Sequence, residues 1–91
     1  MSSDQQAMVE RARRDLGRRL GVSPTEITEE SVEQTDFPDA ALGAPVEDEM
    51  SAQVITPGWR IRLDANGRTY EYRATQKQLR LSNFNGENYR L

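Results

Sequence analysis

The sequence contains no cysteine and no histidine. Without cysteine there are no disulfides, thiolate nucleophiles or thiolate metal ligands. Without histidine the chain lacks the commonest general base and the commonest metal ligand of proteins. Lys77 is the only lysine, so a hydroxyl nucleophile would need that residue or a carboxylate as its base. We therefore expect no catalytic residues, no metal and no cofactor, and a protein that is not an enzyme.

Apolar residues are also scarce, at 35% of the 91 residues, and only 7% of residues are aromatic. No stretch approaches the ~18 consecutive apolar residues of a membrane span, and the N-terminus lacks the apolar segment of a signal peptide. We expect a cytoplasmic protein for the chain as it stands, or an exported one if a signal has been removed. The length suits one domain with a modest core, which we place at residues 1–84.

Charge is distributed unevenly along the chain, whose formal net charge is -3. Residues 22–50 carry nine acidic residues and no basic residue, whereas residues 51–91 carry seven basic residues and three acidic ones. Either the acidic middle folds against its basic neighbours, or it forms an acidic face for a basic partner. A nucleic-acid partner is not expected, because affinity for phosphate depends on a net basic footprint.

Apolar residues recur every four positions near the N-terminus and predict an amphipathic helix over residues 4–20, with Met8, Ala12, Leu16 and Leu20 on its buried side. Gly17 lies inside this helix at a cost of about 1 kcal/mol relative to alanine, which suggests close approach of another element. Residues 23–26 form a second helix-start pattern of cap, proline and acid. Too little follows for a long helix, so we expect one turn and then a strand near 27–35.

The clearest signal is a β-hairpin in the C-terminal half. Apolar and charged residues alternate on both sides of an Asn-Gly pair at 66–67, which favours a two-residue turn. Counting outward from that turn fixes the register of the two strands. It pairs Leu63 with Tyr70, Ile61 with Tyr72 and Arg62 with Glu71.

Weaker patterns flank the hairpin. We expect a short strand at 53–55, a turn at 56–58 and a further strand at 79–81. Residues 85–91 are expected to form a flexible tail, although the Asn-Gly pair in it could turn another short hairpin. Together these elements predict an α+β fold, in which the N-terminal helix packs on an antiparallel sheet of three or four strands.

A long loop at residues 36–51 separates the predicted strands. Pro38, Gly43 and Pro45 interrupt it, and loops of this length are uncommon in compact domains and often functional or mobile. Phe37 and Leu42 are the only large apolar residues in its first half, so we expect them to hold the loop to the core. The acidic run at 47–49 lacks the ligand spacing and glycine of an EF-hand.

The order of these segments resembles a group of small, largely uncharacterised bacterial domains, often found in exported proteins or lipoproteins. Their pattern has a helix, a Trp-Pro-Asp…Leu-Gly-Cys-Pro loop, Thr-Pro-Gly-Tyr-Arg-Ile and a Tyr-Glu-Tyr strand. The similarity covers about residues 7–81 and implies no activity. Phe37 occupies the position of the tryptophan in this pattern, Trp59 that of the tyrosine in Thr-Pro-Gly-Tyr, and Ala44 that of the cysteine. The matching stretches are 12–22, 26–27, 35–45, 53–61 and 70–72.

These observations favour a non-catalytic binding module that uses the loop at 36–50, with another protein as its partner. The protein would be a monomer or a weak dimer. A stand-alone structural domain is the alternative, and a hydrolase using the carboxylates of Asp36 and Asp39 is a remote one. The candidate binding residues are Phe37, Pro38, Asp39, Leu42, Pro57 and Trp59.

Overall fold

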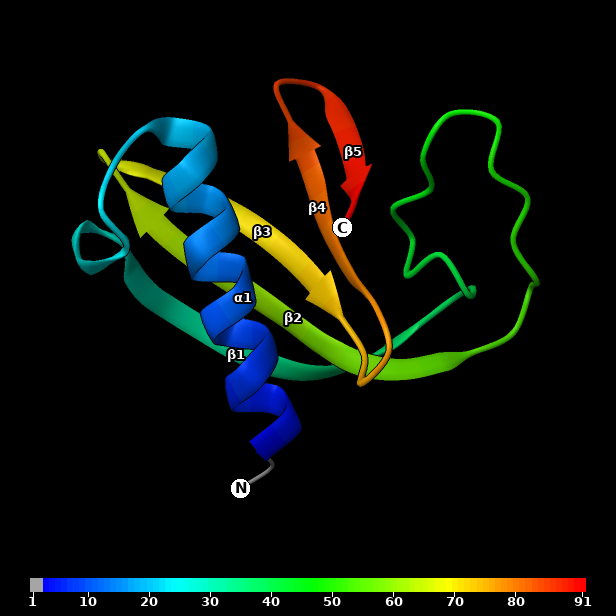
Figure 1. Ribbon diagram of the computed structural model, residues 1–91. Helices are drawn as coiled ribbons and strands as arrows, with labels where there is room; N and C mark the ends of the chain where they lie inside the picture. The colour runs from blue at the N-terminus through cyan, green and yellow to red at the C-terminus, as the bar shows by residue number, and fades with distance from the viewer. Residues whose placement is uncertain (1–2) are drawn as a thin grey trace.

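The computed structural model describes residues 3–91. A helix and a single turn precede five strands: α1 (Ser3–Leu20), η1 (Pro24–Glu26), β1 (Thr28–Phe37), β2 (Thr56–Ala65), β3 (Arg68–Ala74), β4 (Leu79–Phe84) and β5 (Glu87–Arg90). The strands form one antiparallel sheet in chain order (Figure 1). The α+β class is therefore confirmed, but the sheet has five strands where the sequence predicted three or four.

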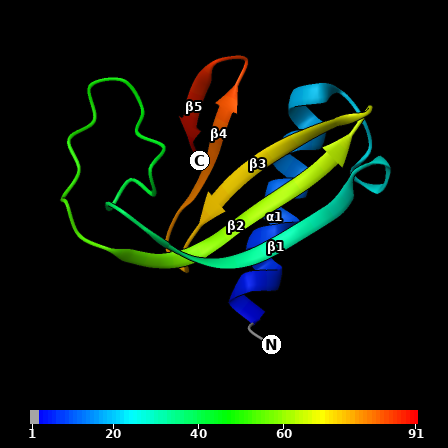
Figure 2. The same ribbon diagram turned by 180° about the vertical axis from the view of Figure 1, so that it is seen from behind.

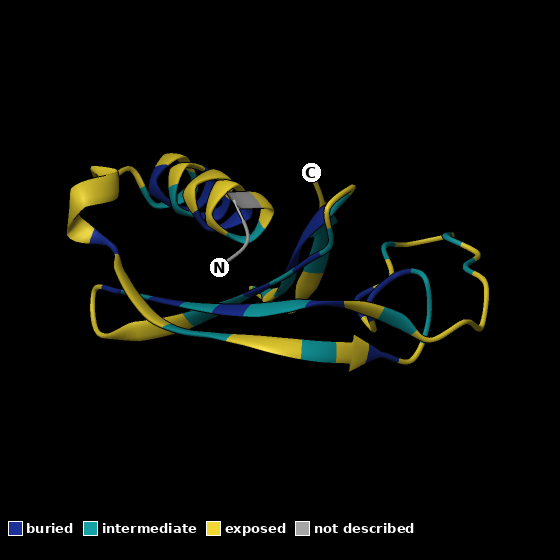
Figure 3. Ribbon diagram, turned by 90° about the horizontal axis from the view of Figure 1, so that it is seen from below, coloured by how far each residue is buried: buried dark blue, intermediate teal, exposed yellow. Residues whose placement is uncertain are grey.

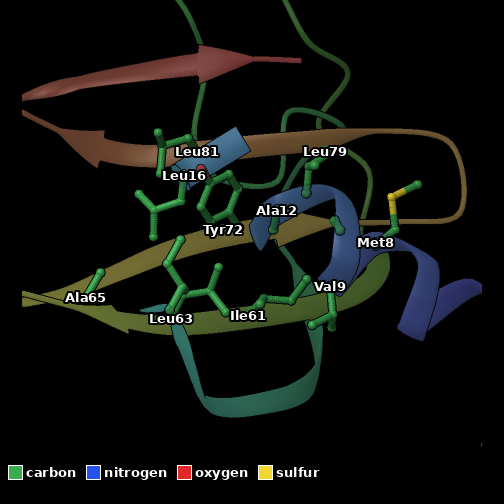
Figure 4. Packing of buried hydrophobic residues seen from close by; sticks show 12 residues of the cluster. Met8, Val9, Ala12, Leu16, Ile61, Leu63, Ala65, Tyr72, Leu79 and Leu81 are labelled. Carbon is green, nitrogen blue, oxygen red and sulfur yellow. The ribbon is translucent and has the colours of Figure 1, made fainter. Parts of the chain in front are cut away.

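Helix α1 lies over one face of the sheet and turns its buried residues toward it (Figure 3). The predicted apolar stripe is confirmed, because Met8, Ala12 and Leu16 are buried and Leu20 packs against the core. Figure 4 shows Ala12 and Leu16 among apolar side chains of the sheet. The sheet residues at the centre of this core are Ile61, Leu63, Tyr72, Leu79 and Leu81.

The chain folds back closely after α1. A Cβ atom at Gly17 would lie only 2.8 Å from the carbonyl oxygen of Val22, so the close approach suggested by this glycine is confirmed. The predicted single turn is confirmed as η1. Its capping box has Ser23 Oγ accepting from Thr25 N and the Glu26 carboxylate accepting from Ser23 N at 3.0 Å.

The predicted hairpin register is confirmed at β2–β3, where Leu63 pairs with Tyr70, Ile61 with Tyr72 and Arg62 with Glu71. Asn66 and Gly67 both have positive φ, at 54° and 77°. A two-residue turn of this kind matches the right-handed twist of the strands.

The start of β2 corrects two predictions. Residues 53–55 form no strand. Residues 56–58 form the start of β2 and not a turn, because β1 extends to Phe37 and pairs with them. Pro57 is tolerated here because β3 ends opposite Trp59, which leaves the strand unpaired on that side. Gly58 is required, since a Cβ atom there would collide with the carbonyl oxygen of Ala74.

The C-terminal residues correct a third prediction. Residues 87–90 form strand β5 instead of a tail, and the Asn85–Gly86 pair supplies the turn. Tertiary contacts hold this strand in place. The ring of Tyr89 lies edge-on to Phe84 at 6.0 Å, and the guanidinium of Arg19 lies 4.4 Å above it.

Candidate functional site

A row of arginines crosses the face of the sheet that points away from α1. Arg60, Arg73, Arg80 and Arg90 lie opposite one another on β2, β3, β4 and β5. Because side chains alternate along a strand, they point away from the face formed by Ile61 and its neighbours. Like charges directly opposite one another are destabilising, so this row needs acidic partners.

Two glutamates are the acidic partners of this arginine row. Glu71 lies on the same face and contacts Arg73 at 2.8 Å and both Arg60 and Arg62 at 3.4 Å. Glu49 reaches the row from the chain between β1 and β2 and binds Arg80 through two 2.6 Å hydrogen bonds. The interpretation that the acidic middle folds against basic neighbours is confirmed for Glu49, and also for Glu29 and Glu33, which pair with Arg13 and Arg62.

The pKa of Glu49 is lowered to about 2. The hydrogen bonds from Arg80 are the main cause, and the backbone N–H of Val46 adds to them. Arg80 itself is only 2% exposed. Glu49 therefore stays ionised at neutral pH and neutralises a buried guanidinium.

Residues 38–55, which we call the β1–β2 loop, are bound to the sheet by side-chain donors. Their first half offers backbone carbonyls to β3, β4 and β5. Arg73 donates to Leu42 O at 3.0 Å, and Arg80 donates to Ala44 O at 3.2 Å. Gln78 and Asn88 donate to Ala40 O and Pro45 O, both at 2.8 Å. In Figures 1 and 2, β4 and β5 lie between this loop and α1.

Three of the predicted binding residues hold the β1–β2 loop in this position. Phe37 and Leu42 are 1% and 0% exposed, and Phe37 lies under the guanidinium groups of Arg60 and Arg73. Both residues lie outside the core cluster under α1, so they hold the loop to the arginine face and not to that core. The carboxylate of Asp39 accepts the backbone N–H groups of residues 41 and 43, while Pro38 is exposed.

The other two predicted residues, Pro57 and Trp59, line an open hollow of about 490 Å³. We call it the Trp59 hollow. It lies where β2 begins and the β3–β4 turn passes, so the fold brings together segments that are distant in sequence. Trp59 is half-buried and packs against the core from one side. The remaining lining residues are Gln34, Thr56, Gly58, Thr75, Gln76, Lys77 and Gln78.

Exposed apolar side chains lie close to this hollow and were not predicted as binding residues. Met50, Val54 and Ile55 are 97%, 53% and 70% exposed, and Ile55 directly precedes Thr56 of the hollow. Met50 lines a second hollow that shares residues 77–78 with the first. The sequence does show an apolar pair, Val54–Ile55, after the acidic run. We had assigned this pair to the predicted strand at 53–55 and not to a binding surface.

A buried ionic network joins α1 to the sheet. Tyr72 donates a 2.7 Å hydrogen bond to Asp15, which also binds Arg19 at 2.7 Å. Burial by itself raises the pKa of Asp15, but the hydrogen bonds from Arg19 and Tyr72, with the charge of Arg19, together hold it below its usual value. Burial, reinforced by the bond to Asp15, raises the pKa of Tyr72. From the sequence, we expected the Tyr72 side chain only to pack in the hairpin, and not to form a buried hydrogen bond.

Within residues 3–91, no three side chains of the types that bind metals gather at one place. Over the same residues, no helix has the length and apolar character that crossing a membrane requires.

Comparison with known proteins gives a family and nothing more specific. No significant match was found among curated proteins or among solved structures. A family model described as "Domain of unknown function (DUF8738)" matches residues 9–82. The match runs from the first turns of α1 into β4 and thus covers most of the chain. The chain therefore belongs to this family of domains of unknown function.

Proposed function

We propose that this domain is a non-catalytic binding module whose partner is another protein. Its contact surface is the Trp59 hollow together with the exposed apolar residues of segment 50–55. The observation that carries the proposal is the hollow itself, an open concave site on a small domain where an aromatic ring and a proline meet. Concave, largely apolar sites with a few polar groups are the usual form of binding sites.

This surface differs from the loop at 36–50 that the sequence favoured. Phe37 and Leu42 are buried, and carbonyls of residues 40, 42, 44 and 45 are occupied by donors from the sheet. A partner would have to displace these contacts to use that part of the loop. The hollow and segment 50–55 need no such rearrangement.

The chemistry of the hollow favours an extended peptide segment with an apolar or proline side chain. Trp59 and Pro57 offer apolar surface, and aromatic-lined grooves bind such segments in other proteins. Gln34 and Gln76 line the same hollow, and neither side chain forms a hydrogen bond within the described residues. Their amides are available to the partner's backbone.

A peptide display library selected on the immobilised protein tests this proposal. Selected peptides should share an apolar or proline position and bind at least tenfold more weakly to Pro57→Ser and Ile55→Ser. Both side chains are exposed, so both variants should keep the melting temperature. Leu91→Ser, a change at another exposed apolar residue, is the matched control. Enrichment of no peptide, or equal binding to all variants, contradicts the proposal.

A stand-alone structural domain is the second candidate, favoured by the burial of Phe37 and Leu42. It predicts that the same library enriches nothing, although the protein is folded. The resemblance to bacterial domains of exported proteins or lipoproteins adds a proposed setting to either function. Membrane-fraction and periplasmic assays of the native gene product test that setting, and recovery in the cytoplasm alone contradicts it.

A further inference from the structure

A different hollow, of about 480 Å³, lies between α1 and the last residues, 90 and 91. Five arginines line it, and we call it the arginine hollow. Positions 11, 14 and 18 fall on one side of a helix, because neighbours on a helix surface are three or four residues apart. The fifth arginine, Arg90, lines the hollow from β5, while its guanidinium lies 3.6 Å from Glu49. The lining residues are Arg11, Arg14, Asp15, Arg18, Arg19, Arg90 and Leu91.

Positive charge is in excess at this site. Asp15 is the only acidic residue in the lining and is shared between Arg18 at 3.2 Å and Arg19 at 2.7 Å. Arg90 lies 3.6 Å from Glu49, which is already bound by Arg80. These two carboxylates leave most of the charge of five guanidinium groups without compensation.

Two of the arginines face solvent without an acidic partner. Within the described residues, the one hydrogen bond of the Arg11 side chain goes to the sulfur of Met8, at 3.7 Å, and Arg14 has no hydrogen bond or ion pair. Glu10, four residues before Arg14, instead accepts a 3.5 Å hydrogen bond from Gln6. The N–H donors of Arg11 and Arg14 are therefore available to a ligand.

The base of the arginine hollow is held rigidly by the fold. The guanidinium of Arg19 lies between Asp15 and the aromatic rings of Tyr89 and Phe84, at 4.4 and 5.7 Å from their centres. Asp15 is in turn fixed by Tyr72. A site whose residues are already positioned loses less entropy when a ligand binds.

We propose that the arginine hollow binds a small ligand carrying two or more phosphate groups. Each phosphate presents several acceptor oxygens, and the planar guanidinium fork matches phosphate with two parallel hydrogen bonds. The guanidinium groups of Arg11, Arg14 and Arg18, which lie along one side of α1, suit adjoining phosphates better than a single carboxylate. A nucleic acid fits less well, because the chain has a net charge of -3 and an acidic stretch at 22–50.

Isothermal titration with sodium tripolyphosphate at physiological ionic strength tests this site. The expected result is saturable binding of one ligand per chain, weakened at least tenfold in the double variant Arg11→Gln/Arg14→Gln. Both side chains are exposed, so this variant should fold normally. The matched control is Arg62→Gln/Arg68→Gln, which removes two positive charges outside the hollow and should change the affinity less than threefold.

Three outcomes overturn the proposal. Absence of saturation, or an equal loss of affinity in both double variants, means that tripolyphosphate is attracted only non-specifically, by positive charge anywhere on the protein. Tighter binding of hexaglutamate than of tripolyphosphate assigns the hollow to an acidic protein segment. Inositol hexakisphosphate extends the test to phosphate esters, and its saturable binding at the same arginines supports the same ligand chemistry.

Discussion

Glu49 shows how one residue acquires its role from a partner that is distant in sequence. It belongs to an acidic run at 47–49, and nothing in that run distinguishes it from its neighbours. In the fold it meets Arg80, which is almost fully buried, and also lies near Arg90. Breaking a buried pair leaves a charge without compensation, which costs far more than losing an exposed pair.

We expect Glu49→Gln to lower the free energy of unfolding at pH 7 by about 1–3 kcal/mol, the usual range for a buried group that loses a charged hydrogen-bond partner. Denaturant unfolding measures this change. Glu47→Gln is the matched control, because Glu47 is exposed in the same acidic run and should have almost no effect. Equal effects of the two variants would contradict a specific role for Glu49.

Glu49 also predicts a pH dependence of stability. Its pKa in the folded protein is about 2, below the ordinary value of 4.5. The ionised group therefore stabilises the fold above pH 4.5, and this contribution is lost as the pH falls toward 2. Asp15 acts in the same direction, because its pKa is also lowered. Glu49→Gln should flatten the stability profile between pH 4.5 and 2 without abolishing the slope, and an unchanged profile would refute this assignment.

Tyr72→Phe should lower the free energy of unfolding by about 1.5–3 kcal/mol, because the lost hydroxyl donates to an ionised carboxylate in a buried position. Thermal and denaturant unfolding measure the effect. Tyr70→Phe is the matched control, since the Tyr70 hydroxyl has no hydrogen bond within the described residues and should be dispensable. If both variants unfold like the parent, the bond between Tyr72 and Asp15 contributes no net stability.

At the scale of elements, the β1–β2 loop divides into two parts. Backbone N–H groups of residues 40–44 donate to carbonyl oxygens or to Asp39, and residues 46 and 49 also have partners. Segment 50–55 lacks such a series and carries the exposed apolar side chains. The first part belongs to the stable structure, while the second part is available for contacts with a partner.

Amide hydrogen exchange followed by NMR should show this division. We expect slow exchange at residues 40–44, comparable with the edge strands, and fast exchange at 50–55. The paired amides of β2 and β3 serve as the internal reference for the most stable region. Fast exchange throughout the loop would show that the arginine contacts do not hold it in solution, and the proposed surface would then have to include residues 36–50.

For the whole molecule, the two faces of the sheet are stabilised differently. Under α1 lies an apolar core with Leu16 at its centre, whereas the other face combines arginines, glutamates and the buried residues Phe37 and Leu42. A chain of 91 residues has a small core, so both faces should be needed for a stable fold.

We expect Leu16→Ala and Leu42→Ala each to lower the free energy of unfolding by about 2–5 kcal/mol, as truncations of buried residues do. Circular dichroism and the fluorescence of Trp59 should report one common transition in both variants. Val54→Ala, at an exposed residue, is the control. A Leu42→Ala protein with unchanged melting but a protease-sensitive loop would show that the loop unfolds separately from the sheet.

Local patterns determined much of this fold. The stripe of α1, the cap of η1 and the β2–β3 register depend on residues close together in the chain, and all of these predictions are confirmed. The α+β class also follows from them, because an amphipathic helix and a one-sided sheet must cover each other.

Only the tertiary structure decided the remaining features, because each depends on a partner that is distant in sequence. Residues 56–58 become strand because β1 extends to meet them, and β5 forms where Arg19, Phe84 and Tyr89 pack together. The arginine row needs strand register, and the burial of Arg80 selects Glu49 from its acidic run. The Trp59 hollow likewise arises where separate elements meet. The arginine hollow combines arginines spaced along one side of α1 with residues 90 and 91, which only the fold brings beside them.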